Sequence, residues 1–288
     1  MSRRAFAAAF ILTLLVVLAS PAAAEAMGKP NVAALQVALR ARGLYHGTID
    51  GISGPATHAA VRRFQRRANL GVDGVVGPQT RRALGRYARH RFGERMLRQG
   101  KTGWDVAALQ FSLAWHGFPS GRFDGGFGPR TDAALRRFQR FAHLGVDGVA
   151  GPATYRALRR PPPRSPLSFQ LPVRAAIGDR FGPRANMFHA GIDLTAWRGA
   201  LVRASRAGRV TFAGWNSGGY GYLVTIRHGH GVRTMYAHLS KILVTRGQRV
   251  AGSARVGRVG ATGHAFGPHL HFEVRVRGAA VNPLPDLR

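Results

Sequence analysis

The spacing of hydrophobic residues divides the chain into two parts. In the first part apolar residues recur at helical intervals, and Val32, Leu35 and Leu39 form one such stripe. Gly-Pro pairs stand where helices would begin, and Asp-Gly pairs mark tight turns. From residue 167 onward the helical spacing is lost, and short runs rich in branched and aromatic residues are separated by glycines. This pattern predicts small all-α units followed by a mainly antiparallel β domain.

The helical part is an internal duplication. Val32–Gln36 returns 74 residues later as Val106–Gln110, and the two copies then align without insertion or deletion. Each copy predicts a bundle of three short helices, the third of them in the first copy over about residues 78–86, and such a bundle is close to the smallest size that folds alone. We expect the copies to span residues 30–90 and 100–160. A proline-rich linker at 161–166 would join them to the β domain at 167–288.

The first residues have the features of a secretory signal. Arg3 and Arg4 precede an apolar run over Ala5–Leu18, and small residues at 22–24 suit a cleavage site before Glu25. A membrane anchor is the alternative, but the apolar run is short for a spanning helix. We therefore expect residues 1–24 to be a signal peptide. Its removal would leave no stable membrane span and would place the protein in the cell envelope, in the periplasm or the cell wall.

Composition restricts both the chemistry and the partners. The chain has no cysteine, so a metal would have to be held by His, Asp or Glu, and no disulfide framework can form. The formal net charge of +31 suits a polyanionic partner. In an exported protein we expect that partner to be an anionic polymer of the cell envelope and not nucleic acid. A generic arginine-rich surface is the alternative explanation of the charge.

The Asp-Gly turns belong to a longer motif that occurs twice in each copy. In the first copy Asp50–Thr57 reads D-G-x-x-G-P-x-T and is followed by Phe64-Gln65, and Val72–Thr80 repeats the motif. Both copies resemble the peptidoglycan-binding domain 1 family in this pattern. The resemblance implies three-helix modules that bind bacterial cell-wall peptidoglycan, two of which in one chain would add avidity. The alternative is that the motif residues only build turns and core, and no ligand-contacting residue is assigned to the repeats.

The β domain contains three clusters of residues that can bind a metal. His189 and Asp193 form an H-x-G-x-D sequence, His238 lies in the sequence Tyr236–Leu239, and His269 and His271 flank one leucine at the start of a predicted strand. Side chains alternate along a strand, so His269 and His271 share a face. Catalytic zinc sites commonly use three nitrogen or oxygen ligands and leave a position for water. The H-E-x-x-H sequence of helix-borne zinc sites is absent from the chain.

Five motifs of the β domain follow one another in a fixed order: Gly178–Arg184, His189–Asp193, Tyr236–Ser240, Gly260–Gly263 and Gly267–Glu273. Together they resemble the M23 family of metallopeptidases, of the lysostaphin/LytM type. The resemblance implies that zinc is bound by His189, Asp193 and His271. It also implies that His238 and His269 are the catalytic histidines beside the metal. Which of these two is the general base stays open, as does the peptide bond that is cut.

The resemblance predicts a secreted zinc endopeptidase that hydrolyses peptide cross-links of peptidoglycan. A non-catalytic wall-binding regulator with an M23-like domain is the alternative, although the chain keeps the complete set of ligand and catalytic residues. A phage endolysin is a third possibility that the export signal disfavours. We interpret His228, His230 and His264 as turn and loop residues. Glu273 either orients a ligand from behind or lies outward on its strand.

Overall fold

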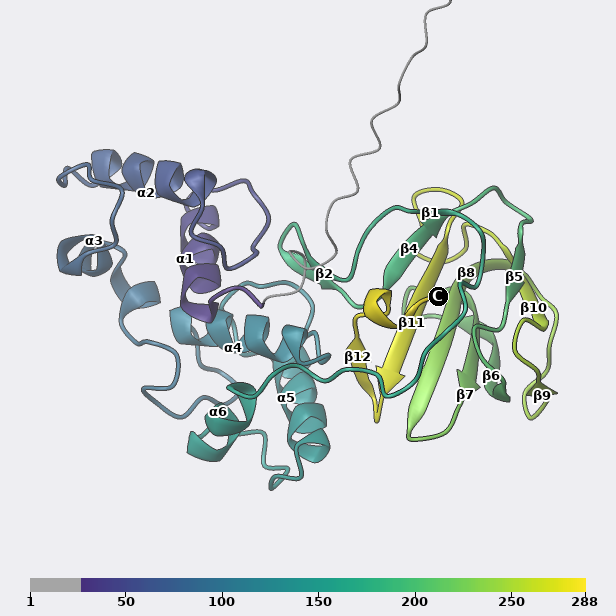
Figure 1. The fold of residues 1–288 in the computed structure, drawn as a ribbon. Coiled ribbons are helices and arrows are strands. Elements are labelled where there is room, and N and C mark those ends of the chain that lie inside the picture. The colour runs from purple at the N-terminus through teal and green to yellow at the C-terminus, as the bar shows by residue number, and fades with distance from the viewer. Residues whose placement is uncertain (1–26) are drawn as a thin grey trace, which may run out of the picture.

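The computed structural model describes residues 27–288, and the predicted signal peptide lies outside them. A helical region and a β domain lie side by side (Figure 1). The predicted fold class is confirmed, because helices occupy the two repeats and a mainly antiparallel β domain follows them. Within residues 27–288 no helix is long and apolar enough to cross a bilayer.

Between residues 27 and 160 the chain forms six α-helices, three in each copy. They are α1 (Pro30–Arg40), α2 (Pro55–Arg67), α3 (Pro78–Ala83), α4 (Trp104–Trp115), α5 (Pro129–Phe141) and α6 (Pro152–Leu158). The third helix of the first copy ends earlier than expected, and a 3-10 helix over Gly85–Ala88 continues it. All but α4 begin with proline, which suits the first helical position because its N–H would have no partner there.

A buried glutamine closes each Asp-Gly turn. Gln110 Nε2 donates to Asp124 Oδ1 over 2.8 Å and to the carbonyl of Gly126 over 2.9 Å. Gln110 Oε1 accepts the N–H of Gly125 over 3.0 Å. The other three turns are closed in the same way by Gln36, Gln65 and Gln139. The polar groups of the Asp-Gly motifs are therefore used inside the bundles, which supports the interpretation that these residues build turns and core.

The two copies pack together mainly through α1 and α4. Every residue of α4 is buried, because the helix packs in two directions. Ala107 and Phe111 join the core of the first copy, whereas Leu109 and Leu113 join the core of the second. The repeats therefore form one packed pair, and α4 is apolar on both sides because both sides are covered.

The β domain is built on an antiparallel sheet. Its strands are β1 (Ala176–Ile177), β4 (Ile192–Thr195), β5 (Leu201–Arg203), β6 (Gly208–Asn216), β7 (Gly221–Arg227), β8 (Val232–Ile242), β9 (Arg249–Val250), β10 (Arg255–Val259), β11 (Leu270–Val276) and β12 (Ala279–Val281). The main order is β1-β4-β11-β8-β7-β6-β9, with β12 beside β11, and β10 between β5 and β8. A separate hairpin joins β2 (Gly182–Arg184) and β3 (Met187–His189).

Strand β11 separates the core of the β domain from a cleft. Leu270 and Phe272 are fully buried in the core on one face of the strand. His271 and Glu273 lie on the other face, as the predicted alternation requires. The neighbouring strand β4 pairs with β11 in a register that sets Asp193 directly opposite His271. The sheet thus places one of the predicted metal ligands beside another.

Candidate metal centre

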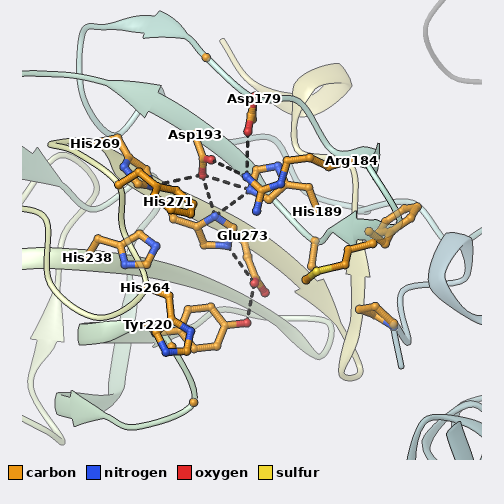
Figure 2. Close-up of a pocket in the computed structure, with 18 of the residues that line it drawn as sticks. Asp179, Arg184, His189, Asp193, Tyr220, His238, His264, His269, His271 and Glu273 are labelled. Atoms are coloured by element: carbon orange, nitrogen blue, oxygen red, sulfur yellow. Dashed lines mark hydrogen bonds and ion pairs between the residues drawn. The ribbon is translucent and has the colours of Figure 1, made fainter. Parts of the chain in front are cut away.

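A cleft of about 610 Å³ opens over the face of β11 that carries His271 (Figure 2). The cleft is lined by the segment before β2, which includes Asp179, and by the loop before β11, which includes His264. The turn after β6, with Tyr220, and Pro119 and Gly121 of the second repeat also line it. The structure brings together in this cleft all five residues that the sequence singles out: His189, Asp193, His238, His269 and His271.

Three donor atoms meet at the centre of the cleft. His189 Nε2 lies 3.1 Å from Asp193 Oδ1 and 3.0 Å from His271 Nδ1. His271 Nδ1 and Asp193 Oδ1 are 2.8 Å apart. A tetrahedral ion with ligands at 2.0–2.1 Å would hold three donors about 3.3 Å from one another, so this triangle has nearly the size that such an ion requires. Among the described residues these three form the group suited to a metal ion.

The tautomers of the two imidazoles favour a cation between them. His189 Nδ1 donates to the carbonyl of Arg180 over 2.9 Å, which leaves the lone pair of Nε2 facing the centre. Neutral His271 keeps its proton on Nε2, which faces Glu273 Oε1 at 3.0 Å, so the lone pair of Nδ1 also faces the centre. Two lone pairs and a carboxylate cannot form hydrogen bonds with one another. They can be satisfied together by a divalent metal ion.

Close packing between strands makes this geometry possible. Gly191 lies between the two ligands of the H-x-G-x-D sequence, and a Cβ at that position would overlap the carbonyl of Phe272 on β11. The glycine therefore lets β4 approach β11 in the register that pairs Asp193 with His271. The segment before β2 acts through its backbone, because the Arg180 carbonyl orients His189 and the Asp179 carbonyl accepts the N–H of Asp193 over 2.9 Å.

In the metal-free protein a proton on His271 holds the cluster together. Burial alone would lower the pKa of His271, but hydrogen bonds to Asp193 and Glu273 outweigh burial and raise that pKa to about 9. Burial would likewise raise the pKa of Asp193, yet the neighbouring imidazoles of His189 and protonated His271 hold it well below its ordinary range. The carboxylate of Asp193 is thus charged at neutral pH.

Glu273 supports the centre from behind. Its side chain is almost fully buried, and its Oε1 accepts bonds from His271 Nε2 and, over 2.7 Å, from the hydroxyl of Tyr220. Arg275 Nε donates to Oε2 over 2.6 Å, and its Nη2 lies 3.3 Å from the Tyr220 hydroxyl. Burial would raise the pKa of Glu273, but the charge of Arg275 and the bond from His271 hold it below its ordinary range. Of the two interpretations of Glu273, the structure supports the one in which it orients a ligand.

His238 and His269 stand beside the triangle with one ring nitrogen free. His238 Nδ1 donates to the carbonyl of Thr262 over 2.7 Å, and His269 Nδ1 donates to the carbonyl of Gly267 over 2.9 Å. Both Nε2 atoms are therefore unprotonated in the neutral rings, and His269 Nε2 lies 3.7 Å from Asp193 Oδ1. Burial, helped by the charges of neighbouring histidines, lowers the pKa of His238 to about 4, so this ring is neutral at pH 7.

Arg184, His264 and Tyr220 also line the cleft, although the sequence assigned no metal-binding or catalytic role to them. Arg184 donates to Asp179 over 2.8 Å and lies 3.5 Å from Asp193 Oδ2, beside the entrance (Figure 2). His264, interpreted as a loop residue, is exposed on the loop between β10 and β11 and also lines the cleft. His228 lies outside the cleft, buried between the Ala207 carbonyl and the Thr234 hydroxyl. Tyr220 carried no sequence signal, because only the fold brings it to Glu273.

Comparison with known families agrees with these features. Residues 187–283 match peptidase family M23, and residues 28–84 and 102–158 each match a peptidoglycan binding domain. The β domain is an M23 peptidase domain. The two helical repeats that precede this M23 domain are peptidoglycan-binding repeats, as their motifs indicated.

The proteins that this chain resembles are named for different activities. The chain is 51% identical over 114 residues to the DD-carboxypeptidase/endopeptidase Mpg of Neisseria meningitidis serogroup B, over 39% of this chain and 26% of that protein. It is 34% identical over 121 residues to the murein hydrolase activator NlpD of Escherichia coli, over 42% and 31% of the two chains. A solved structure of a zinc containing peptidase from Vibrio cholerae matches at 34% identity with a TM-score of 0.39, over 41% and 39%. The chain spans less than two fifths of the length of each of these proteins.

Proposed function

We propose that this protein is a zinc-dependent endopeptidase that hydrolyses peptide cross-links in bacterial peptidoglycan. The observation that carries the proposal is the convergence of His189 Nε2, Asp193 Oδ1 and His271 Nδ1 within 3.1 Å of one another, on the floor of an open cleft. The M23 domain and the similarity to the endopeptidase Mpg support a peptidase, and the two repeats support peptidoglycan as the polymer on which it acts.

His189, Asp193 and His271 would hold the zinc ion. Bound zinc would supply a Lewis acid that lowers the pKa of water and polarises the scissile carbonyl group. Two neutral imidazoles and one carboxylate give the ion a single negative charge from the protein, which leaves it acidic. Glu273 fixes the tautomer of His271 and increases the basicity of its Nδ1.

His238 and His269 would carry the proton transfers. Backbone carbonyls fix the proton of each ring on Nδ1, so each Nε2 can accept a proton at the reacting centre. A low pKa keeps His238 neutral at pH 7, with the lone pair of Nε2 available. Once protonated, either ring can donate to the leaving amine or stabilise negative charge on the carbonyl oxygen. The two rings are tilted by 57° to each other with centroids 4.8 Å apart, close enough to act on one substrate.

The repeats would hold the enzyme on its substrate. Two peptidoglycan-binding repeats precede the M23 domain, and the formal charge of +31 favours an anionic envelope. We place the protein in the cell envelope after removal of the signal peptide at residues 1–24. A non-catalytic wall-binding regulator is the second candidate, because the chain also resembles the activator NlpD. The complete constellation of three donors and two free imidazoles favours the enzyme.

The proposed activity is tested on purified peptidoglycan sacculi and on a soluble cross-linked muropeptide dimer. We expect the protein to convert the dimer to monomers, a strong zinc chelator to stop the reaction, and added zinc to restore it. Mass spectrometry of the products identifies the bond that is cut. Sedimentation with sacculi but no cleavage of either substrate, with zinc bound, would support the regulator instead.

The affinity for zinc is expected to rise with pH up to about pH 9. Below that value Nδ1 of His271 carries a proton that zinc must displace, since the hydrogen bonds to Asp193 and Glu273 raise its pKa to about 9 against the effect of burial. One displaced proton gives an increase of about tenfold per pH unit, which levels off above pH 9. By the same linkage, the proton stabilises the metal-free fold below pH 6.5, and this contribution is lost as the pH rises through 9. Competition with a chromophoric chelator measures the affinity, and a flat profile between pH 7 and 9 would contradict the role of His271.

A further inference from the structure

The second repeat is docked on the M23 domain through its backbone. Ala280 on β12 donates its N–H to the carbonyl of Gly117 over 3.1 Å, and Phe123 donates to the carbonyl of Asn186 over 2.7 Å. Figure 1 shows the helical region against the edge of the β domain that carries β2 and β12. The two bonds lie on either side of residues 118–122, which we call the docking loop. Both ends of the docking loop are therefore fixed to the M23 domain.

Side chains extend this contact on both sides of the docking loop. The ring of Trp115 packs edge-to-face on Phe188 and Phe181, with centroids 5.4 and 6.5 Å apart. Arg277 places its guanidinium group 4.8 Å from the ring centroid of Phe141 and donates to His143 Nε2 over 3.1 Å. The interface thus combines buried aromatic packing with a cation–π contact, and the second repeat contributes Trp115 to the first and Phe141 to the second.

The duplicated copy shows that the docking side chains are specific to the second repeat, whereas the backbone bond of Phe123 has a counterpart in the first repeat, from the N–H of Ile49 to the carbonyl of Ala185 over 2.8 Å. The positions of Trp115, Phe141 and His143 correspond, 74 residues earlier, to Ala41, Arg67 and Asn69. In the first copy the small side chain of Ala41 replaces the indole, the positive charge of Arg67 would be repelled by Arg277, and the side-chain amide of Asn69 replaces the imidazole. The fold of the bundle does not need the docking side chains, because the first copy forms the same three helices without them.

The docking loop reaches the catalytic cleft. Pro119 and Gly121 line the cleft together with Asp179, Arg184 and the metal-centre histidines. Arg137 of α5 supports the loop by donating to the carbonyl of Pro119 over 3.4 Å. One side of the cleft is therefore made by a wall-binding repeat and not by the M23 domain.

We infer that the docking loop is a substrate-binding surface of the peptidase, which narrows the cleft around the stem peptides of peptidoglycan. The inference rests on the proposed function. Pro119 and Gly121 offer only backbone groups and a small apolar ring, so they can contact substrate but cannot transfer protons. Contacts of this kind act equally on the bound substrate and on the transition state, so their loss raises KM and leaves kcat nearly unchanged.

Gly117 allows a matched test of docking. Its φ of +88° is in the left-handed region, and a Cβ there would overlap the backbone O and N atoms of Ala280. Its counterpart Gly43 has a φ of +69°, and a Cβ there would meet nothing within 4 Å. Gly117→Ala and Gly43→Ala therefore carry similar backbone strain, but only Gly117→Ala pushes the repeat off the M23 domain. Phe141→Arg is a second undocking variant. It restores the residue of the first copy at a half-buried position and sets two guanidinium groups against each other.

The experiment measures docking and kinetics in the whole protein. Hydrogen exchange of the Ala280 and Phe123 amides reports docking, and cleavage of the soluble muropeptide dimer gives kcat and KM. We expect faster exchange at both amides and a KM about tenfold higher in Gly117→Ala and Phe141→Arg, with kcat and zinc content as in the parent. Gly43→Ala should match the parent in all of these.

The outcomes separate this inference from the proposed function. If the parent cleaves the dimer and the undocked variants keep its KM, the inference is wrong and the endopeptidase stands. If neither amide exchanges faster in both undocking variants, the contacts described above do not hold the repeat and the inference is also wrong. A parent that leaves the dimer intact overturns the proposed function and the inference with it.

Discussion

Replacement of His189 by alanine is expected to remove zinc from the protein and to lower cleavage of peptidoglycan by about three orders of magnitude or more. Nε2 of His189 is one of three donor atoms that lie within 3.1 Å of one another. Without it two ligands remain, whereas catalytic zinc sites use three from the protein. Metal analysis of the purified variant and the rate of cleavage of the muropeptide dimer measure the two effects.

His264→Ala is the matched control for this replacement. His264 lines the same cleft from an exposed loop, and it does not belong to the donor triangle. We expect His264→Ala to keep its zinc and to change the rate much less than His189→Ala. An unchanged zinc content in His189→Ala, or equal rates for the two variants, would disprove the assignment of His189.

Replacement of Glu273 by glutamine is expected to weaken zinc binding about 10- to 100-fold and to destabilise the fold by about 3–5 kcal/mol. The amide keeps the shape of the side chain but removes the charge that faces His271 Nε2 at 3.0 Å. It also leaves Arg275, which donates to Glu273 Oε2 over 2.6 Å, without its negative partner. Zinc titration and urea unfolding of the metal-free protein measure the two losses separately.

Glu94→Gln shows what loss of an exposed carboxylate does. The side chains of Glu94 and Arg91 are both largely exposed, and Arg91 Nε lies 4.0 Å from Glu94 Oε1. Such pairs contribute less than about 1 kcal/mol, so this variant should be close to the parent in stability and in zinc affinity. If Glu273→Gln behaves like Glu94→Gln, Glu273 is not a support of the metal centre.

Much of the candidate site could be predicted from the sequence because its ligands lie on regular strands. The alternation of β11 places His271 and Glu273 on the face opposite Leu270 and Phe272, and the structure confirms this. The duplication, the helices of each copy and the change to β structure after the linker were also evident in the pattern of residues. In each case a local period determines which face a side chain occupies.

The partners of Glu273 and the docking of the second repeat depend on which element covers a face of a strand or helix. The periodicity of the sequence does not contain that information. Alternation leaves open whether Glu273 meets solvent or Tyr220, which lies 53 positions earlier in the chain. The same limit applies to the second repeat, whose residues were read as parts of a separate module. No local pattern gives His143 a partner, and it receives a hydrogen bond from Arg277 only because the repeat docks on the M23 domain.

Docking also changes how the proposed wall binding relates to the proposed cleavage. The repeats share a core through α1 and α4, and the second repeat is bonded to β12, so the modules cannot move independently of the cleft while these contacts hold. Residues 161–165 of the proline-rich segment line one pocket together with Trp115 and Phe181 at this interface. Peptidoglycan held by the repeats would therefore reach the cleft from a fixed direction.

The central claim is that one zinc ion is held by His189, Asp193 and His271. Crystals of the zinc-loaded protein measured at the zinc absorption edge test it most directly, because the anomalous difference map locates the ion without reference to activity. The account predicts a single strong peak bonded to His189 Nε2, Asp193 Oδ1 and His271 Nδ1, with His238 and His269 beside it and unbound. A map with no peak among these three side chains, or with its peak on His238 and His269, would contradict the account.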